Sequence, residues 1–172
     1  MTEIINSIGY SGEVSVRLTR SKSKEFRIHN LGYKALWDLL AMCVAGYNVS
    51  EKAPKYFTVC SRTGTGTEED PYKYQDCLLS QLPFIGTVWG DVVDQKSTST
   101  STRFTVTVTK NNRRLTVKDN ETAVLRMFNK KGEVLAEVVD NTDRVIAKSH
   151  NSMITGVDAI YEWKMTFKNV SS

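Results

Sequence analysis

A strict alternation of apolar and polar side chains near the C-terminus constrains the fold of this chain most. In residues 159–168 every second side chain is apolar, and only Ile160 interrupts the pattern. Successive side chains of a β-strand point to opposite faces, so this pattern predicts a strand with one buried face. That face carries Tyr161, Trp163 and Phe167, and aromatic side chains bury large areas. We therefore expect this strand to lie in the middle of a core.

The same period of two recurs along the chain and predicts a mainly β fold. It occurs in residues 12–20, 24–29, 56–62, 104–109, 115–117, 123–129 and 133–140. The first two segments are joined by a short polar turn, and the last two by Lys130-Lys131-Gly132, where glycine suits the positive φ of a tight turn. We expect two hairpins here, within an antiparallel β-sandwich or β-barrel.

One principal α-helix is expected near residues 31–45, where the apolar period changes. Asn30 can cap its start and Gly46 can end it. Apolar residues recur at the spacing of one helix face at Ala35, Leu36, Leu39, Leu40 and Cys43.

This helix is apolar on almost every side, because Trp37, Met42 and Val44 widen its apolar face. Only Lys34 and Asp38 are charged within it. Such a helix must be covered on most sides. We expect either a sheet and a loop of the same chain to cover it, or a contact between subunits.

Two segments are expected to be irregular, and one is left unassigned. Residues 61–76 contain two glycines, a proline and the acidic run Glu68-Glu69-Asp70, which favours a long exposed loop. Residues 94–103 hold a Ser/Thr tract, which indicates a flexible connection or an exposed edge. Residues 77–90 show no clean period. Because the 172 residues show no repeat and no shift in composition, we expect one domain, residues 1–172.

The sequence contains no recognisable metal or cofactor motif. Cys43, Cys60 and Cys77 stand 17 residues apart without a paired spacing, which favours reduced, buried thiols over a zinc site. Gly64-Thr65-Gly66 lacks the remaining residues of a phosphate-binding loop. The acidic run lacks the alternate spacing of a calcium loop. We expect no metal and no cofactor.

No catalytic group can be chosen from the sequence either, so we do not expect an enzyme. The only histidines are His29 and His150, and neither accompanies a nucleophile motif. We expect His29 to pack at a corner between strand and helix, and His150 to lie in a loop. Activity that depends on these histidines or on a cysteine is not expected.

Charge and hydropathy bear on possible partners. Basic residues gather at Arg17, Arg20, Lys22, Lys24 and Arg27, and again at Lys110, Arg113, Arg114 and Lys118. The net charge is only +4, and the alternation places several of these residues on solvent faces, so we do not expect nucleic acid as a partner. The first residues carry no secretory leader pattern, and no apolar run approaches the ~18 residues of a membrane span. We expect no membrane partner.

At two places the chain resembles small structural proteins of tailed bacteriophage virions. One is residues 29–37, HNLGYKALW, with Leu40 and Gly46, where an asparagine and a glycine lead into an apolar helix. Tyr33 departs from this pattern, which has a small hydroxyl residue there. The other is residues 161–169, YEWKMTFKN, similar to the closing strand of such β-sandwich subunits.

The resemblance implies a non-enzymatic virion component that assembles in many copies in the host cytoplasm. Its partners would be further copies of itself and other virion proteins. It would be a capsid decoration or head-fibre subunit, or a neck or tail component. The alternative is a monomeric β-sandwich recognition module that binds carbohydrate or protein through Tyr47, Tyr56, Tyr72 and Tyr74.

Overall fold

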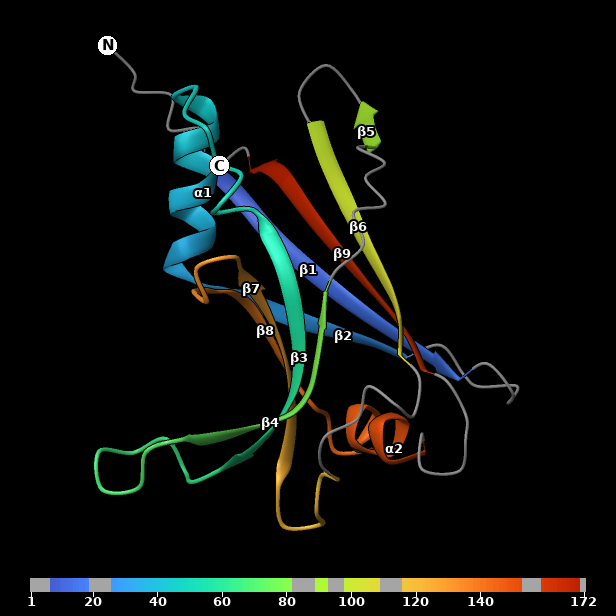
Figure 1. Cartoon of the computed structure of the whole chain (residues 1–172). Coiled ribbons are helices and arrows are strands. Elements are labelled where there is room, and N and C mark those ends of the chain that lie inside the picture. The colour runs from blue at the N-terminus through green and yellow to red at the C-terminus, as the bar shows by residue number, and fades with distance from the viewer. Residues whose placement is uncertain are drawn as a thin grey trace.

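A computed structural model describes residues 7–18, 26–81, 89–92, 98–108, 116–152 and 159–170. Within these residues the chain forms nine β-strands and two α-helices (Figure 1). The expected mainly β fold with a helix inside residues 31–45 is confirmed. The elements are β1 (Ser7–Leu18), β2 (Phe26–Gly32), α1 (Lys34–Val44), β3 (Pro54–Thr63), β4 (Lys73–Gln81), β5 (Trp89–Val92), β6 (Thr98–Val108), β7 (Thr122–Asn129), β8 (Val134–Val139), α2 (Val145–Ser152) and β9 (Ala159–Val170).

The strands form two antiparallel sheets that share β2. Their hydrogen-bonded order is β4-β3-β7-β8-β2-β1-β9-β6-β5. The first part of β2 pairs with β1, and its last residues, Leu31 and Gly32, pair with β8. The rings of Phe57 on β3 and Tyr161 on β9 lie 5.5 Å apart. Side chains of the two sheets therefore meet in a common core.

Strand β9 occupies the central position that the sequence predicts. It pairs with β1 on one side and with β6 on the other. Tyr161 and Trp163 are buried, while Phe167 is partly buried against the core. Val14 on β1 and Phe104 on β6 lie opposite Trp163, and both are buried. The apolar face of β9 is thus packed from both neighbouring strands.

Both expected hairpins are present. β1 pairs with β2, and β7 pairs with β8, each antiparallel. Gly132 in the second turn has a φ of +81°, a left-handed conformation that glycine adopts without the steric cost of a Cβ atom.

The structure corrects the segments that we expected to be irregular. Strands β3 and β4 extend into residues 61–76 and leave only 64–72 as a loop. Residues 98–102 of the Ser/Thr tract belong to β6 and pair with β5 and β9, because threonine suits a pleated surface. Residues 116–117 are not in a strand. The other residues of these segments lie outside the described ranges.

The stretch that the sequence left unassigned contains strand at both of its ends. β4 continues to Gln81, and β5 begins at Trp89. The residues between them, 82–88, lie outside the described part of the chain.

Helix α1 begins later than the sequence predicts, and Asn30 is not its N-cap. The chain stays extended through Gly32, because the end of β2 pairs with β8. The backbone N–H of Tyr33 donates a hydrogen bond to the Leu135 carbonyl, 2.9 Å away, and Tyr33 takes the N-cap position. Gly46 follows the helix with a φ of +76°, as expected.

Helix α2 was not predicted, and the expectation that His150 lies in a loop is wrong. His150 lies on α2 and is fully buried. Only three adjacent apolar residues, 145–147, precede a polar run, so no helical period is visible in the sequence. The helix is anchored by the Asp140 carboxylate, which accepts hydrogen bonds from the backbone N–H groups of Ile146 and Ala147, each at 2.9 Å.

Candidate functional site

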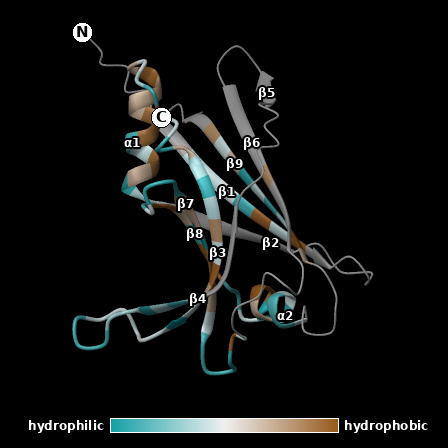
Figure 2. Cartoon of the chain, viewed as in Figure 1, coloured by the Kyte–Doolittle hydropathy of each residue, from teal (hydrophilic) through white to brown (hydrophobic). Residues whose placement is uncertain are grey.

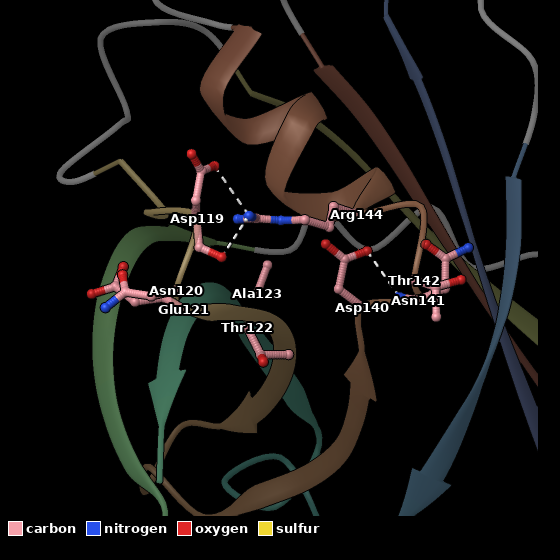
Figure 3. A pocket seen from close by; sticks show the side chains of 9 residues that line it. All are labelled: Asp119, Asn120, Glu121, Thr122, Ala123, Asp140, Asn141, Thr142 and Arg144. Atoms are coloured by element: carbon pink, nitrogen blue, oxygen red, sulfur yellow. Dashed lines mark hydrogen bonds and ion pairs between the residues drawn. The ribbon is translucent and has the colours of Figure 1, made fainter.

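A polar pocket of about 320 Å³ lies beside the start of α2 (Figure 3). One wall is the turn before β7, and the other is the segment between β8 and α2. The lining residues are Asp119, Asn120, Glu121, Thr122, Ala123, Asp140, Asn141, Thr142 and Arg144.

Arg144 ties the two walls of this pocket together. Its Nη1 donates to the Asp119 carbonyl at 2.8 Å and to Asp119 Oδ1 at 3.1 Å. Its Nη2 donates to the Lys118 carbonyl at 2.7 Å. The backbone φ of Arg144 is +56°, which is uncommon for a residue other than glycine. The side chain therefore connects segments far apart in sequence.

Asp140, the other central charged group of the pocket, is also fully engaged. Its Oδ1 accepts hydrogen bonds from the N–H groups of Asn141 and Ile146, and its Oδ2 accepts one from Ala147. Burial raises the pKa of this carboxyl above its usual value, although the three hydrogen bonds oppose the rise. Because the side chains of Arg144 and Asp140 are already engaged in these hydrogen bonds, we assign no binding role to the pocket.

The candidate histidines and cysteines occupy separate places. His150 is buried on α2, and Cys60 is buried in β3. The expectation of a buried thiol is wrong for Cys43, which is exposed near the end of α1. His29 lies in β2 and Cys77 in β4, but their side chains are outside the description.

The described residues contain neither a group of metal-binding side chains nor a membrane-spanning helix. They contain no group of three or more His, Cys, Asp or Glu side chains that is arranged to hold a metal ion. In the same part of the chain, neither helix is long and apolar enough to cross a membrane.

Helix α1 packs on the body of the protein only through its first turns. Leu36 and Leu39 are buried, whereas Trp37 is 41% exposed, Val44 90% and Tyr47 67%. In Figure 2 the ribbon of α1 is teal, hydrophilic, at its N-terminal end and mainly brown or tan toward its C-terminal end. We call residues 37, 41 and 43–47 the α1 face, because all of them are exposed.

The α1 face carries no charged side chain. The only charged residues of α1, Lys34 and Asp38, form an ion pair of 2.6 Å with each other. The polar part of α1 is therefore confined to its N-terminal half. Own-chain coverage, one of the two expectations for this helix, is not found among the described residues.

A cluster of charged and aromatic side chains covers the outer face of the sheet that contains β4, β3, β7 and β8. Arg126 Nε lies 2.9 Å from Glu137 Oε2, and Arg62 Nη1 lies 3.8 Å from Glu137 Oε1. The Arg62 guanidinium stacks 4.0 Å from the centre of the Tyr72 ring, and that of Arg126 stacks 4.0 Å from the centre of Tyr74. We call these five residues the arginine cluster.

The arginine cluster spans four strands, because Arg62, Tyr74, Arg126 and Glu137 lie on β3, β4, β7 and β8. Arg126 lies opposite both Thr58 and Glu137 in the register of β3, β7 and β8. Tyr74 lies on β4 and Arg126 on β7, the two strands that flank β3, so their contact crosses over β3. Cys60 and Thr58 on this face of β3 are buried. The cluster thus covers part of the sheet with long side chains.

The tyrosines proposed for recognition do not form one site. Tyr72 and Tyr74 are neighbours, with ring centres 6.4 Å apart, and both belong to the arginine cluster. Tyr47 lies at the end of α1, and Tyr56 is partly buried in β3.

The structure confirms that the acidic loop is exposed, but it describes only one side chain of the two basic groups. Glu68, Glu69 and Asp70 are exposed as expected, and Asp70 Oδ2 accepts a hydrogen bond from the Thr65 N–H at 3.0 Å. Of the basic groups, only the Lys118 side chain is described, and it is exposed. The side chains of the other basic residues lie outside the described part of the structure, so the expectation about them stays a prediction.

The arginine cluster was not predicted, although the sequence holds one signal for it. The hairpin of β7 and β8 was expected, and its register places Arg126 opposite Glu137. Oppositely charged residues at such positions stabilise a sheet. The positions of Arg62 and Tyr72 depend on the pairing of β3 with two other strands, for which the sequence has no local signal.

Comparison with known proteins adds no relative: no family model, no curated protein and no solved structure matches this chain. Function is therefore inferred from the two surfaces described above, the α1 face and the arginine cluster.

Proposed function

We propose that this chain is a non-enzymatic structural subunit of a bacteriophage virion, present in many copies, and that the α1 face contributes to the contact between copies. The observation that carries the proposal is the exposed, uncharged α1 face. It includes Val44, which is 90% exposed, at the end of a helix whose other half is packed.

The physical support is the free energy of covering this face. Burying a large apolar side chain is worth about 1.5–3 kcal/mol, and Trp37, Val44 and Tyr47 are all large and exposed. Monomeric proteins rarely leave contiguous apolar patches in water. A second copy of the same chain offers the same patch, and closed symmetry is the usual result of such self-complementary contacts.

The place in a virion comes from the resemblance in sequence. Its first segment forms the end of β2 and the start of α1, and its second lies within β9. A capsid decoration or head-fibre subunit, or a neck or tail component, would use both a rigid β core and a contact between copies.

The mass of the chain in solution tests the multi-copy part of the proposal. We expect light scattering over a range of micromolar concentrations to give a multiple of the 19.4 kDa chain mass. In purified virions that contain the chain, we expect many copies per particle by quantitative mass spectrometry. A chain that is monomeric at every concentration and present in a single copy per particle contradicts the proposal.

A second candidate function is a monomeric recognition module for carbohydrate or protein. The observation in its favour is the pair Tyr72 and Tyr74 on the hairpin of β3 and β4, where Tyr72 is 43% exposed. Figure 1 shows the end of this hairpin extending away from the rest of the molecule. A strictly monomeric chain that binds a glycan or protein through Tyr72 favours this candidate.

A further inference from the structure

We infer that the arginine cluster is a binding site for an oxyanion, the carboxylate or phosphate group of a ligand. The first support is the balance of charge. Two guanidinium groups, of Arg62 and Arg126, share the single carboxylate of Glu137. Burial raises the pKa of the nearby Tyr33 phenol, so that group stays neutral near pH 7. Among the described side chains, the cluster therefore keeps an excess positive charge.

The second support is the hydrogen bonding of the two guanidinium groups. Each carries several N–H donors in a planar fork. Arg62 reaches Glu137 only at 3.8 Å, which is an ion pair but too long for a hydrogen bond. Arg126 Nε lies 2.9 Å from Glu137 but is not aligned to donate a hydrogen bond. Glu137 instead accepts a hydrogen bond from the Tyr33 hydroxyl at 3.0 Å.

The third support is that the donors are held in place. Each guanidinium is stacked on a tyrosine ring at 4.0 Å, which restricts its plane before any ligand arrives. Such preorganisation lowers the entropic cost of binding. The ring of Tyr72 also lies close to Gly66 in the loop. A Cβ atom added at Gly66 would lie only 2.5 Å from the ring.

The fourth support is the partial burial of the positive charges. The Arg62 and Arg126 side chains are 15% and 16% exposed, while Glu137 is 6% exposed. The Glu137 side chain is therefore less exposed than that of either arginine, and the Nε atom of Arg126 is buried as well. Partly buried charges are screened less by salt than exposed ones, and an arginine fork matches a carboxylate or phosphate with two parallel hydrogen bonds.

The test uses the full chain, with inorganic phosphate and acetate as probes. Each anion is titrated at constant ionic strength, with chloride as the balancing salt, while NMR follows the arginine Nε–H signals. We expect saturable shifts of the Arg62 and Arg126 signals with at least one probe. Phosphate alone indicates a phosphate-bearing ligand, acetate alone a carboxylate, and saturation by both a general oxyanion site.

Arg62→Met is the informative variant, because Glu137 keeps Arg126 as its partner and the buried carboxylate is not left unpaired. We expect this variant to lose saturation. Arg62→Lys keeps the charge but not the fork, and we expect about tenfold weaker binding, the order of one lost charge-assisted hydrogen bond. Lys148→Met, which removes an exposed charge on α2, is the matched control and should bind like the parent.

The inference is overturned if neither anion gives saturable shifts, or if Arg62→Met and Lys148→Met change the titration equally. The result is independent of the assembly proposed above. Light scattering on the same samples records the mass, so a failure of anion binding and a failure of assembly are separate outcomes.

Discussion

The two helices of this protein differ in a way that runs against their sequences. Helix α1 is made largely of apolar residues, yet only Leu36 and Leu39 are buried. Helix α2 contains lysine, serine, histidine and asparagine, yet five of its eight residues are buried. The two helices lie at opposite ends of the molecule (Figure 1).

Hydropathy alone therefore does not decide which residues of this chain are buried. α2 is held by hydrogen bonds from its N–H groups to Asp140 and then buries both apolar and polar side chains. α1 lacks a side-chain cap at its start and leaves Val44 and part of Trp37 in solvent. Apolar surface that the chain itself does not cover is available to another copy.

The largest loss of stability is expected in the core, and it gives a reference for substitutions in the two helices. Trp163→Ala removes a buried aromatic side chain of the central strand. We expect a loss of about 3–5 kcal/mol in the free energy of unfolding, because transfer and cavity terms add. Urea denaturation measures it, and an unchanged midpoint would place Trp163 in solvent.

A matched pair of truncations compares the helices directly. Ile146 on α2 is fully buried, whereas Val44 on α1 is 90% exposed. We expect Ile146→Ala to cost about 2–5 kcal/mol and Val44→Ala to stay within about 0.5 kcal/mol in the monomer. Equal losses, measured by denaturation at low protein concentration, would remove the distinction between the helices.

The anchor of α2 gives an intermediate effect. Asp140→Ala removes the acceptors for the N–H groups of Ile146 and Ala147, and loss of an N-cap typically costs about 1 kcal/mol. Asp143→Ala, an exposed substitution in the same turn, is the control and should be close to neutral. Identical unfolding midpoints for the two variants would contradict the capping role.

The smallest expected effect concerns the segment after α1 and its dependence on pH. The Lys52 ammonium and the Asn129 amide hold the pKa of the Glu133 carboxyl below its ordinary 4.5. A lowered folded-state pKa stabilises the protein above the unfolded value, and this contribution is lost as pH falls through the folded pKa.

The measurement compares the parent with Glu133→Gln. We expect a small stability difference in favour of the parent near neutral pH, which disappears at acidic pH. Glu69→Gln, in the exposed loop, is the control and should show no such trend. A difference that stays constant with pH argues against the ion pair with Lys52.

Much of the β architecture was predictable, because alternation is a local signal. The aromatic face of β9 and the hairpin around Gly132 are both visible in neighbouring residues. Helix α2 was not predictable, since its short apolar run, 145–147, does not form a helical period. Its start is fixed by hydrogen bonds to Asp140 and its side chains pack in the core, and only the folded chain makes these contacts.

The candidate surfaces were predictable to different degrees. The excess of apolar residues on α1 is visible in the sequence, and it predicts a helix in need of cover. Which residues remain uncovered depends on how the helix docks on the sheet, so the exposure of Cys43 was missed. The contact of Tyr74 with Arg126 crosses a whole strand, and no spacing in the sequence encodes it.

The central claim, that a second copy covers the α1 face, is tested most directly by the mass of two lysine variants measured side by side. Val44→Lys places a charge on the α1 face, and Thr142→Lys places one at an exposed position in the turn before α2. We predict that Thr142→Lys keeps the oligomeric mass of the parent, whereas Val44→Lys sediments as the 19.4 kDa monomer with an unchanged circular dichroism spectrum. A Val44→Lys variant with the parent's oligomeric mass, or a parent chain that is already monomeric at every concentration, would contradict the claim.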